Sequence, residues 1–390
     1  MIKRNDANAI EFEDLSSYSS SKDYKRRRKN KPLRIVLKSI LAIFSVALIV
    51  GGSLLIHASE SLFSGLSTVD FTKDKEELGI KLTATNDDSI KNIAFFGVDS
   101  RDGSFEGLSD AIMVLTVDNK HGKIKMTSIL RDTRIDNIEG VGTQKINAAY
   151  DYGGAKLAIK TINQNFDLNI EDYVTINFYN LAVVVDAFGG TEITMTDEEA
   201  YYTNENLNAL MYEQIHDGYE RTIWESDFLP SSDGYVSGGT FTLNGNQAVA
   251  YARNRSDSDF DRADRQKKVL MGLFSRLKSM STSEYFPLLE RVMPLCETSM
   301  GLDDAWACAP IMLKDFSIQT LTIPGEEEAA FGGDLYDGVG WHFSYDLELA
   351  AQHIDRFIYE SDSPYWAGIS DDTGIGSAGG AGLSNVNENG

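Results

Sequence analysis

One short segment of this acidic chain is rich in arginine and lysine. Tyr251–Lys268 reads YARNRSDSDFDRADRQKK and holds six cations and four aspartates, although the whole chain has a formal net charge of −23. Arginine binds phosphate oxygens through a planar pair of N–H donors, and the free N–H groups at a helix start add to that attraction. The segment indicates a local anion site, although alone it is equally compatible with a charged loop neutralised by its own aspartates. The candidate phosphate-binding residues in it are Arg253, Arg255, Arg262, Arg265 and Gln266.

Two aspartates and one more arginine stand at the ends of apolar runs that read as strands. Asp99 directly follows KNIAFFGV, and Asp110 directly precedes AIMVLTV. Carboxylates at such points can converge on one hard cation, and an all-oxygen site favours Mg²⁺, with Mn²⁺ as the alternative. Arg131 follows a third run, at a position from which side chains point into ligand crevices. Each feature alone also fits an ordinary turn, but together they predict a pyrophosphate site of the kind that phosphoryl transfer needs.

A change of charge divides the chain. Residues 1–38 carry eleven Lys or Arg and five Asp or Glu, a net charge of +6, which leaves −29 for the remainder. Residues 39–56 pass without a charge and would span about 27 Å as a helix, close to the thickness of a bilayer core. The basic flank predicts a cytoplasmic N-terminus. We expect a single-pass anchor at 33–57; a cleaved signal peptide is the less favoured alternative, because the leader and the apolar core are too long.

Charge and cysteine content exclude two classes of function. The external part is too acidic to bind nucleic acid broadly, because its field repels polyanions. Cys296 and Cys308 are the only cysteines and the five histidines are scattered, so the spacing of a zinc site is missing. The two cysteines could pair in an oxidising compartment or remain structural thiols, and their spacing favours neither.

Strand-like and helix-like runs alternate after residue 90. Short apolar runs predict strands and longer amphipathic runs predict helices. The alternation predicts an α/β fold: one α-β-α catalytic domain around a central mixed β-sheet, preceded by one transmembrane helix. The expected strands are 91–99, 111–118, 123–130, 173–178, 191–195 and 316–325. The expected helices are 155–166, 180–190, 263–280, 284–297, 302–314 and 346–359, and the stretch 241–255 is expected to begin at a turn and become a helix.

Composition predicts five parts along the chain. They are a basic, Ser-rich cytoplasmic tail (1–32), the transmembrane helix (33–57), a weakly ordered membrane-proximal segment (58–90), an extracytoplasmic catalytic domain (91–366) and a Gly/Ser/Asn-rich tail (367–390). Within the domain, residues 197–240 are polar, aromatic and irregular, and we interpret them as an insertion.

The motifs, in their order, resemble the LytR-CpsA-Psr family of envelope phosphotransferases. They are FFGVDSR, SDAIMVLTV, SILRDTR, KINAAYDYGG, VDAFGG and LNGNQAVAYARNR with DFDRADRQ, within roughly residues 90–282. The resemblance implies transfer of a glycopolymer phosphate, of the teichoic acid or capsular polysaccharide type, from an undecaprenyl-pyrophosphate carrier to a peptidoglycan hydroxyl. It places this reaction on the outer face of the cytoplasmic membrane in a Gram-positive-type envelope. It also implies an apolar tunnel for the polyprenyl chain.

The resemblance also implies roles for single residues. Asp99 and Asp110 would hold Mg²⁺, and Asp132 or Asp264 could assist deprotonation of the acceptor, with neither preferred. The pyrophosphate would be bound by Arg131, Arg253, Arg255, Arg262 and Gln266, with Arg101 and Arg265 in addition. The catalytic set would be Asp99, Arg131, Arg253 and Arg255. Tunnel candidates are Ile176, Phe178, Val183, Val184, Phe188 and Leu270, each of which is more simply explained as core.

Residues 197–240 and 283–366 carry no motif of the family, and acceptor or polymer specificity could depend on them. Three rival functions remain. The same groups could serve a lipid pyrophosphatase that uses water as nucleophile, or the protein could be a non-catalytic polymer-binding scaffold. A transcriptional regulator is disfavoured by the acidic external part, the anchor and the lack of a helix-turn-helix signal.

Overall fold

The computed structural model describes residues 67–68, 71–100, 104–216, 221–255, 258–313, 315–334 and 336–365. The predicted tail 1–32, the predicted anchor 33–57, the C-terminal tail and Arg101 lie outside these residues. Within the described ranges, no helix is both long enough and apolar enough to cross a membrane. The anchor and the domain boundaries therefore stay predictions.

A seven-stranded mixed sheet forms the centre of the fold. Its order is β1-β12-β7-β2-β3-β4-β13; β3 is antiparallel to β2 and β4, whereas β7 runs parallel to β2 and β13 parallel to β4. The strands are β1 (Ser67–Thr68), β2 (Ile90–Val98), β3 (Ser109–Asp118), β4 (Lys123–Ile129), β7 (Asp172–Asn177), β12 (Glu297–Thr298) and β13 (Ser317–Ile323). The predicted α/β fold with a central mixed sheet is confirmed.

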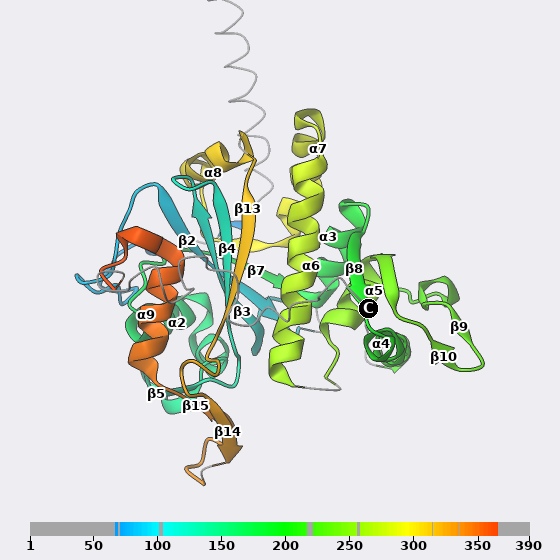
Figure 1. Cartoon of the computed structure of the whole chain (residues 1–390), viewed down its shortest axis with the longest axis horizontal. Coiled ribbons are helices and arrows are strands. Elements are labelled where there is room, and N and C mark those ends of the chain that lie inside the picture. Colours follow the sequence, from blue (N-terminus) through cyan, green and yellow to red (C-terminus); the bar gives the residue numbers. More distant parts are fainter. Residues whose placement is uncertain are drawn as a thin grey trace, which may run out of the picture. The chain divides into compact units, whose positions relative to one another are not determined.

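Helices cover both faces of this sheet (Figure 1). On one face lie α2 (Ala148–Phe166) and α9 (Leu347–Tyr359); on the other lie α3 (Phe178–Ala187), α5 (Gly245–Ala252) and α6 (Asp259–Ser279). Successive residues of a strand point to opposite faces. Phe96 therefore packs in the core with α2 and α9, whereas Phe95 packs against the core that holds α5 and α6. Burial on both faces explains why the strands read as nearly continuous apolar runs.

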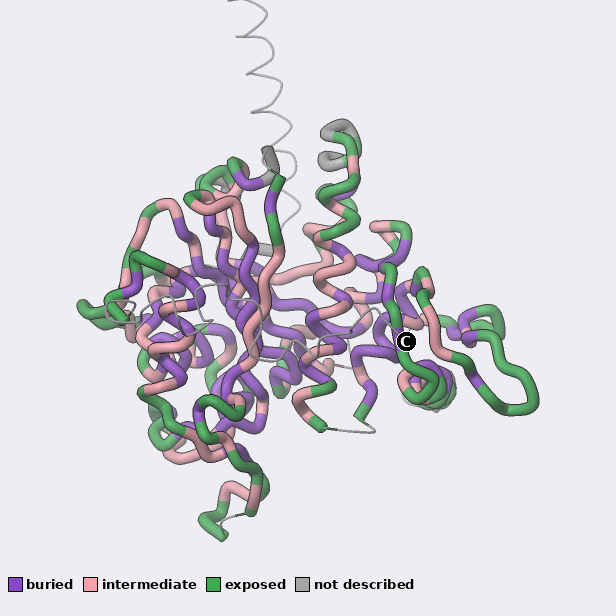
Figure 2. Tube along the Cα trace, in the orientation of Figure 1, coloured by how far each residue is buried: buried purple, intermediate pink, exposed green. Residues whose placement is uncertain are grey.

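The remaining elements surround this centre. Further helices are α4 (Asp197–His216), α7 (Thr282–Val292) and α8 (Leu302–Cys308). Pairs of short strands are β5 (Arg134–Ile138) with β6 (Gly142–Lys145), β8 (Thr191–Met195) with β11 (Gly239–Leu243), β9 (Ser231–Ser232) with β10 (Tyr235–Val236), and β14 (Phe331–Asp334) with β15 (Trp341–Ser344). Figure 2 shows that the β14–β15 hairpin is exposed over most of its length and buried near its base.

Helix α4 lies where the sequence predicted an irregular segment. A capping box begins it: Thr196 Oγ1 accepts from the N–H of Glu199 at 3.1 Å, and the Glu199 carboxylate accepts from the N–H of Thr196 at 3.0 Å. Ala200, Leu207 and Leu210 are fully buried. Because these few apolar residues stand among tyrosines and asparagines, the helical period is weak in the sequence. The expectation of an irregular segment was wrong for Asp197–His216.

The segment 71–90, expected to be weakly ordered, packs on the domain. Lys73 and Lys91 each pair with both Asp172 and Asp304, at 2.6–2.8 Å. The Asp172 side chain is only 1% exposed, so these lysines balance a buried charge. Ion pairs with residues distant in the sequence help to attach this segment to the domain. The local sequence pattern therefore did not predict that the segment is ordered.

The two cysteines are free thiols. Burial raises the pKa of Cys296 to about 12 and that of Cys308 to about 11. A thiol with so high a pKa is a poor nucleophile at neutral pH, which fits structural thiols.

Candidate phosphate-binding site

A β-bulge places Asp110 at one end of the sheet. Gly97 of β2 pairs with Ala111 of β3, whereas the next β2 residue, Val98, pairs with Ser109. Asp110 is therefore the extra residue on β3. A bulge turns a side chain away from the regular alternation of the strand, and here it brings the Asp110 carboxylate within reach of helix α6.

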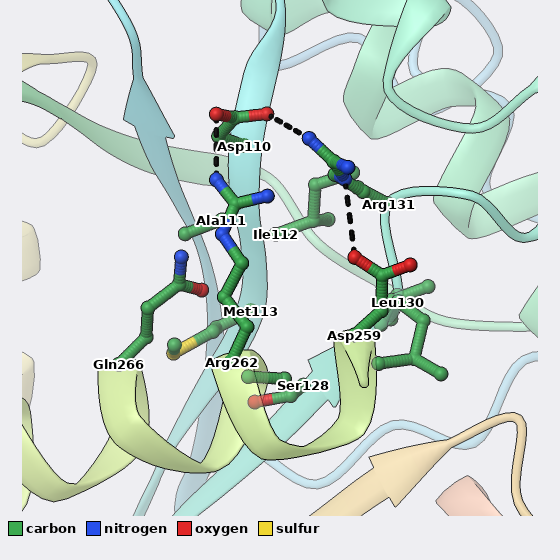
Figure 3. Close-up of a pocket in the computed structure, with 12 residues that line it drawn as sticks. Asp110, Ala111, Ile112, Met113, Ser128, Leu130, Arg131, Asp259, Arg262 and Gln266 are labelled. Atoms are coloured by element: carbon green, nitrogen blue, oxygen red, sulfur yellow. Dashed lines mark hydrogen bonds and ion pairs between the residues drawn. The ribbon is translucent and has the colours of Figure 1, made fainter. Parts of the chain in front are cut away.

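Three arginines from three segments surround this carboxylate. Arg131 follows β4, Arg255 follows α5, and Arg262 lies in the first turn of α6. They donate to Asp110 at 2.9, 3.0 and 2.6 Å, respectively, and Figure 3 shows Arg131 and Arg262 on either side of it. Burial alone would raise the pKa of Asp110, but the charges of Arg262 and Arg131 outweigh burial and hold this pKa below its ordinary value. Asp110 is therefore ionised at neutral pH and orients three guanidinium groups.

Part of the Arg262 guanidinium has no acceptor. The side chain is 4% exposed and uses Nη2 on Asp110, but Nε and Nη1 have no hydrogen-bond partner among the described residues. The same is true of Gln266 Nε2, one turn further along α6, and of Ser128 Oγ on β4. Burial lowers the pKa of Arg262 and neighbouring arginines lower it further, against the attraction of Asp110. Buried donors without partners destabilise a fold, so this arrangement suits a ligand that supplies acceptor oxygens.

These donors line one polar pocket between β3, β4 and α6 (Figure 3). Its volume is about 20 Å³, which is too small for a phosphate group, so a phosphate could enter only if the lining side chains moved apart. Asp110 lines this pocket together with the free donors of Arg262 and Gln266.

An apolar cavity adjoins the polar pocket. The two share Ala111, Met113 and Gln266. Among the tunnel candidates, Ile176, Phe178 and Leu270 line this cavity; Val184 and Phe188 lie in the adjoining core, and Val183 is only partly buried. Its volume of about 30 Å³ holds about one or two water molecules. A ligand with an anionic head and an apolar chain would meet both surfaces in the right order, but the chain would have to move the cavity walls apart.

A carboxyl pair lies beside Arg131. Arg131 Nε donates to Asp132 at 3.1 Å and lies 3.5 Å from Asp259 (Figure 3 shows the second contact). Burial and the adjacent Asp132, with which it shares a hydrogen bond, raise the pKa of Asp259. The pair can therefore hold a proton next to the arginines. Of the two candidate bases, Asp132 adjoins the pocket, whereas Asp264 is half exposed and pairs with Lys268 at 3.0 Å.

Sequence reasoning missed Asp259 because it placed the helix start at residue 263. Helix α6 begins at Asp259, and a capping box marks this start. Ser258 Oγ accepts from the N–H of Asp261 at 3.2 Å, and the Asp261 carboxylate accepts from the N–H of Ser258. A serine followed three residues later by an acidic residue is a readable capping signal. With that start, Arg262 falls in the first turn and Gln266 one turn later on the same face.

Asp99 is a neighbour of this site but lines a different pocket. It directly follows Val98, the β2 residue beside the bulge, and lines a polar pocket of about 720 Å³ together with Ser100, Glu106 and Tyr150. The donor types fit Mg²⁺, because Asp99 follows β2 and Asp110 lies near the start of the adjacent strand β3, and both carry carboxylate oxygens. Both oxygens of Asp110, however, already accept from arginines, so a cation here would share Asp110 with the arginines or compete with them for it. Three-ligand groups of acidic and histidine side chains in the described part of the chain lie elsewhere.

Three predicted arginines of the described chain line neither pocket: Arg255, which still contacts Asp110, and Arg253 and Arg265, which bind elsewhere. Arg253 pairs with Glu213 through both Nη atoms, at 3.0 and 3.1 Å, and lies 5.7 Å from the ring centre of Phe178. Arg265, only 1% exposed, donates to the carbonyl of Asn254 at 3.0 Å. Both contacts fix the turn after α5, so the geometry gives these two residues a positioning part. The structure thus gathers Asp110, Arg131, Arg255, Arg262 and Gln266, with Asp99 next to them.

The chain is similar to proteins of one family. The model of the LytR_cpsA_psr family matches residues 60–348. A polyisoprenyl-teichoic acid–peptidoglycan teichoic acid transferase, TagU of Halalkalibacterium halodurans, is 33% identical over 240 residues, which cover 60% of this chain and 67% of TagU. The crystal structure of TagV from Bacillus subtilis is 27% identical, covers 70% of this chain and 98% of TagV, and has a TM-score of 0.53. A structure of TagT with bound octaprenyl pyrophosphate is 21% identical, covers 74% of this chain and 99% of TagT, and has a TM-score of 0.51, a likeness of fold.

Proposed function

The chain belongs to the LytR-CpsA-Psr family, and we propose that it transfers a glycopolymer phosphate from a polyprenyl-pyrophosphate carrier to a saccharide hydroxyl of peptidoglycan. The relatives named as teichoic acid transferases and the octaprenyl pyrophosphate bound by TagT support a lipid-linked donor. The polymer that this chain carries is of the teichoic acid or capsular polysaccharide type.

One observation carries this proposal. The free donors of Arg262 and Gln266 face a buried pocket that continues into a cavity lined by apolar residues. A pyrophosphate has oxygens for these donors, and a prenyl chain has the apolar surface for the cavity. A nucleotide would not fit, because its sugar and base would meet the apolar wall without hydrogen-bond partners.

The chemistry needs charge stabilisation more than covalent catalysis. The acceptor oxygen forms a bond to the phosphorus that carries the polymer, the P–O bond of the pyrophosphate bridge breaks, and the lipid monophosphate leaves with the electron pair. Arg131, Arg255 and Arg262 would face the charge that develops on the leaving oxygens, where fixed donors stabilise the transition state most. The proton of the hydroxyl would pass to the carboxyl pair of Asp132 and Asp259, which lies beside Arg131.

Asp99 and Asp110 would hold Mg²⁺. When bound, the ion would neutralise phosphate oxygens and align them. Arginines that leave Asp110 would then be available for the phosphate. The Asp110 carboxylate would thus serve as a placeholder, because it binds the arginines until the lipid-linked substrate replaces it. The reaction would take place outside the cytoplasmic membrane, with the chain anchored through 33–57.

The test uses the full chain in detergent, a polyprenyl-pyrophosphate-linked saccharide, peptidoglycan oligomers and Mg²⁺, with products identified by mass spectrometry. We expect a phosphodiester-linked glycan, and we expect it to disappear in Arg262→Gln. Arg276→Gln is the matched control, because Arg276 lies on the same helix but exposed, at 3.3 Å from the carbonyl of Phe188. If lipid monophosphate forms without a glycan adduct, the protein is a pyrophosphatase and the proposal is wrong. If both variants lose the product, the loss in Arg262→Gln gives no support to a role of Arg262 in the site.

A further inference from the structure

The β14–β15 hairpin forms an outer wall of the candidate site. Phe343 of β15 packs with Phe260, Leu130 and Ala263, and the last two line the polar pocket. The N–H of Phe343 also donates to the carbonyl of Asp132 at 2.9 Å. The hairpin is therefore fixed at its base to the residues that carry the carboxyl pair, and it projects outward from there (Figure 1).

A series of aromatic rings leads from the pocket to the surface. Phe260, the residue after Asp259, meets Phe343 edge to face at 5.3 Å, and Phe343 meets Trp341 in the same way at 4.8 Å. Side chains alternate along a strand, so Trp341 and Phe343 share the face of the hairpin that packs toward α6. Trp341 is 44% exposed, and the series ends there in solvent.

Gly332 fixes the orientation of the Trp341 ring. The ring lies across the backbone of the partner strand, where a Cβ on Gly332 would stand only 2.3 Å from it. One face of the indole thus rests on Gly332, and the edge-to-face contact with Phe343 holds the indole from the side. Asp334 is the direct partner of Trp341 across the hairpin, so its side chain lies on the same face. A flat, rigidly held ring with a carboxylate beside it can stack on a pyranose and accept a bond from one of its hydroxyls.

The charge of the hairpin differs from that of a surface that binds membranes. Residues 331–344 contain two aspartates and no lysine or arginine; Asp337 pairs with Arg134, and Asp334 lies on the face of the hairpin that carries the ring. An anionic lipid surface attracts basic segments and repels acidic ones, whereas a neutral sugar ring is indifferent to that charge. The aromatic surface therefore favours a saccharide over a lipid surface.

We infer that Trp341 and Asp334 form a saccharide-binding platform that holds a pyranose of the acceptor glycan next to the phosphate site. This inference rests on the proposed function for the identity of the glycan as acceptor, but the binding itself needs no donor. The platform gives residues 331–344, which carry no family motif, a part in acceptor choice.

Binding is measured by calorimetry on the full chain in detergent, with chitotetraose and with soluble peptidoglycan oligomers as probes and without lipid donor. We expect Trp341→Ala to weaken binding about tenfold, which is about 1.4 kcal/mol. Gly332→Ala should weaken it as well, because the new methyl group displaces the ring while the tryptophan is kept. Phe331→Ala is the matched control: Phe331 belongs to the same hairpin and is 56% exposed, but it points to the opposite face.

The outcomes separate this inference from the proposed function. Equal affinity of wild type and Trp341→Ala, equal loss in Phe331→Ala, or no binding of either probe by the wild type would overturn the platform. Binding to phosphatidylglycerol vesicles that depends on Trp341, without glycan binding, would assign the surface to lipid instead. If the glycan binds through Trp341 but no transfer product forms with the donor, the proposed function fails and the saccharide platform stands.

Discussion

Asp110 and Asp99 are neighbours in the fold but have different surroundings. Replacing each of them therefore distinguishes an effect on stability from an effect on activity. In Asp110→Asn, Arg262 keeps its burial but loses the carboxylate that balances its charge. We expect the free energy of unfolding to fall by about 3 kcal/mol, as when one partner of a buried pair is removed. Asp99 is only partly buried, so Asp99→Asn should change this free energy by less than about 0.5 kcal/mol. Urea denaturation measures both values.

Both variants should nevertheless lose transfer activity, because the proposed metal site needs both carboxylates. Equal stability losses in the two variants would contradict the placeholder role of Asp110. Full activity in Asp99→Asn would contradict a role of Asp99 in metal binding.

Asp259 predicts a particular pH dependence of stability. Its pKa is raised in the folded state by burial and then by Asp132, so the folded protein binds this proton more tightly than the unfolded chain. The resulting stabilisation is complete below the unfolded pKa of about 4 and is lost as pH rises through the raised pKa. In Asp259→Asn, the new amide stays neutral and can still donate to Asp132. The wild type should therefore lose stability relative to Asp259→Asn as pH rises above about 4; a difference independent of pH would refute the shared proton.

Among the helices, α3 and α5 set the position of the Arg255 segment. A Cβ on Gly245, the first residue of α5, would stand 2.0 Å from the carbonyl oxygen of Ala182 on α3. Gly245→Ala should therefore push the two helices apart and reduce the free energy of unfolding by about 2 kcal/mol, as overpacking does. Affinity for inorganic pyrophosphate should fall too, because Arg255 moves with α5; calorimetry measures it.

Gly333→Ala is the control for this substitution, because a Cβ there would have no atom within 4 Å. It should leave both stability and pyrophosphate affinity unchanged. If Gly245→Ala behaves in the same way, the close approach of α3 and α5 does not position the arginine.

The elements also show how far the sequence could be interpreted. The central strands were predictable because they are buried on both faces, and the helix starts at Asp197 and Asp259 carry capping signals that a closer reading would have used. The bulge at Asp110 was not predictable, since the register between β2 and β3 depends on both strands and on what packs against them. The gathering of arginines was foreseen, but the partners that draw Arg253 and Arg265 away from the pockets, Glu213 and the Asn254 carbonyl, belong to tertiary structure.

Across the whole chain, charge is distributed so that an anion finds few places to bind. The part after residue 38 has a net charge of −29, and in the described residues the arginines at the site already share Asp110 as a counter-charge. A general attraction for anionic polymers is therefore absent from this surface, because the long-range field repels them. We expect the lipid chain, rather than charge alone, to provide much of the affinity for the donor.

The apolar cavity allows a test of that division between head group and chain. Leu270→Trp fills the cavity from α6, and it should weaken binding of octaprenyl pyrophosphate by about tenfold or more, while affinity for inorganic pyrophosphate changes by less than about twofold. Ser275→Trp adds the same side chain at an exposed position of the same helix and should alter neither. The cavity must widen to admit a prenyl chain, so in the wild type amide hydrogen exchange along α6 should change with octaprenyl pyrophosphate more than with inorganic pyrophosphate. If the two ligands lose affinity equally in Leu270→Trp, the chain does not enter between α6 and the sheet, and the two pockets are not parts of one site.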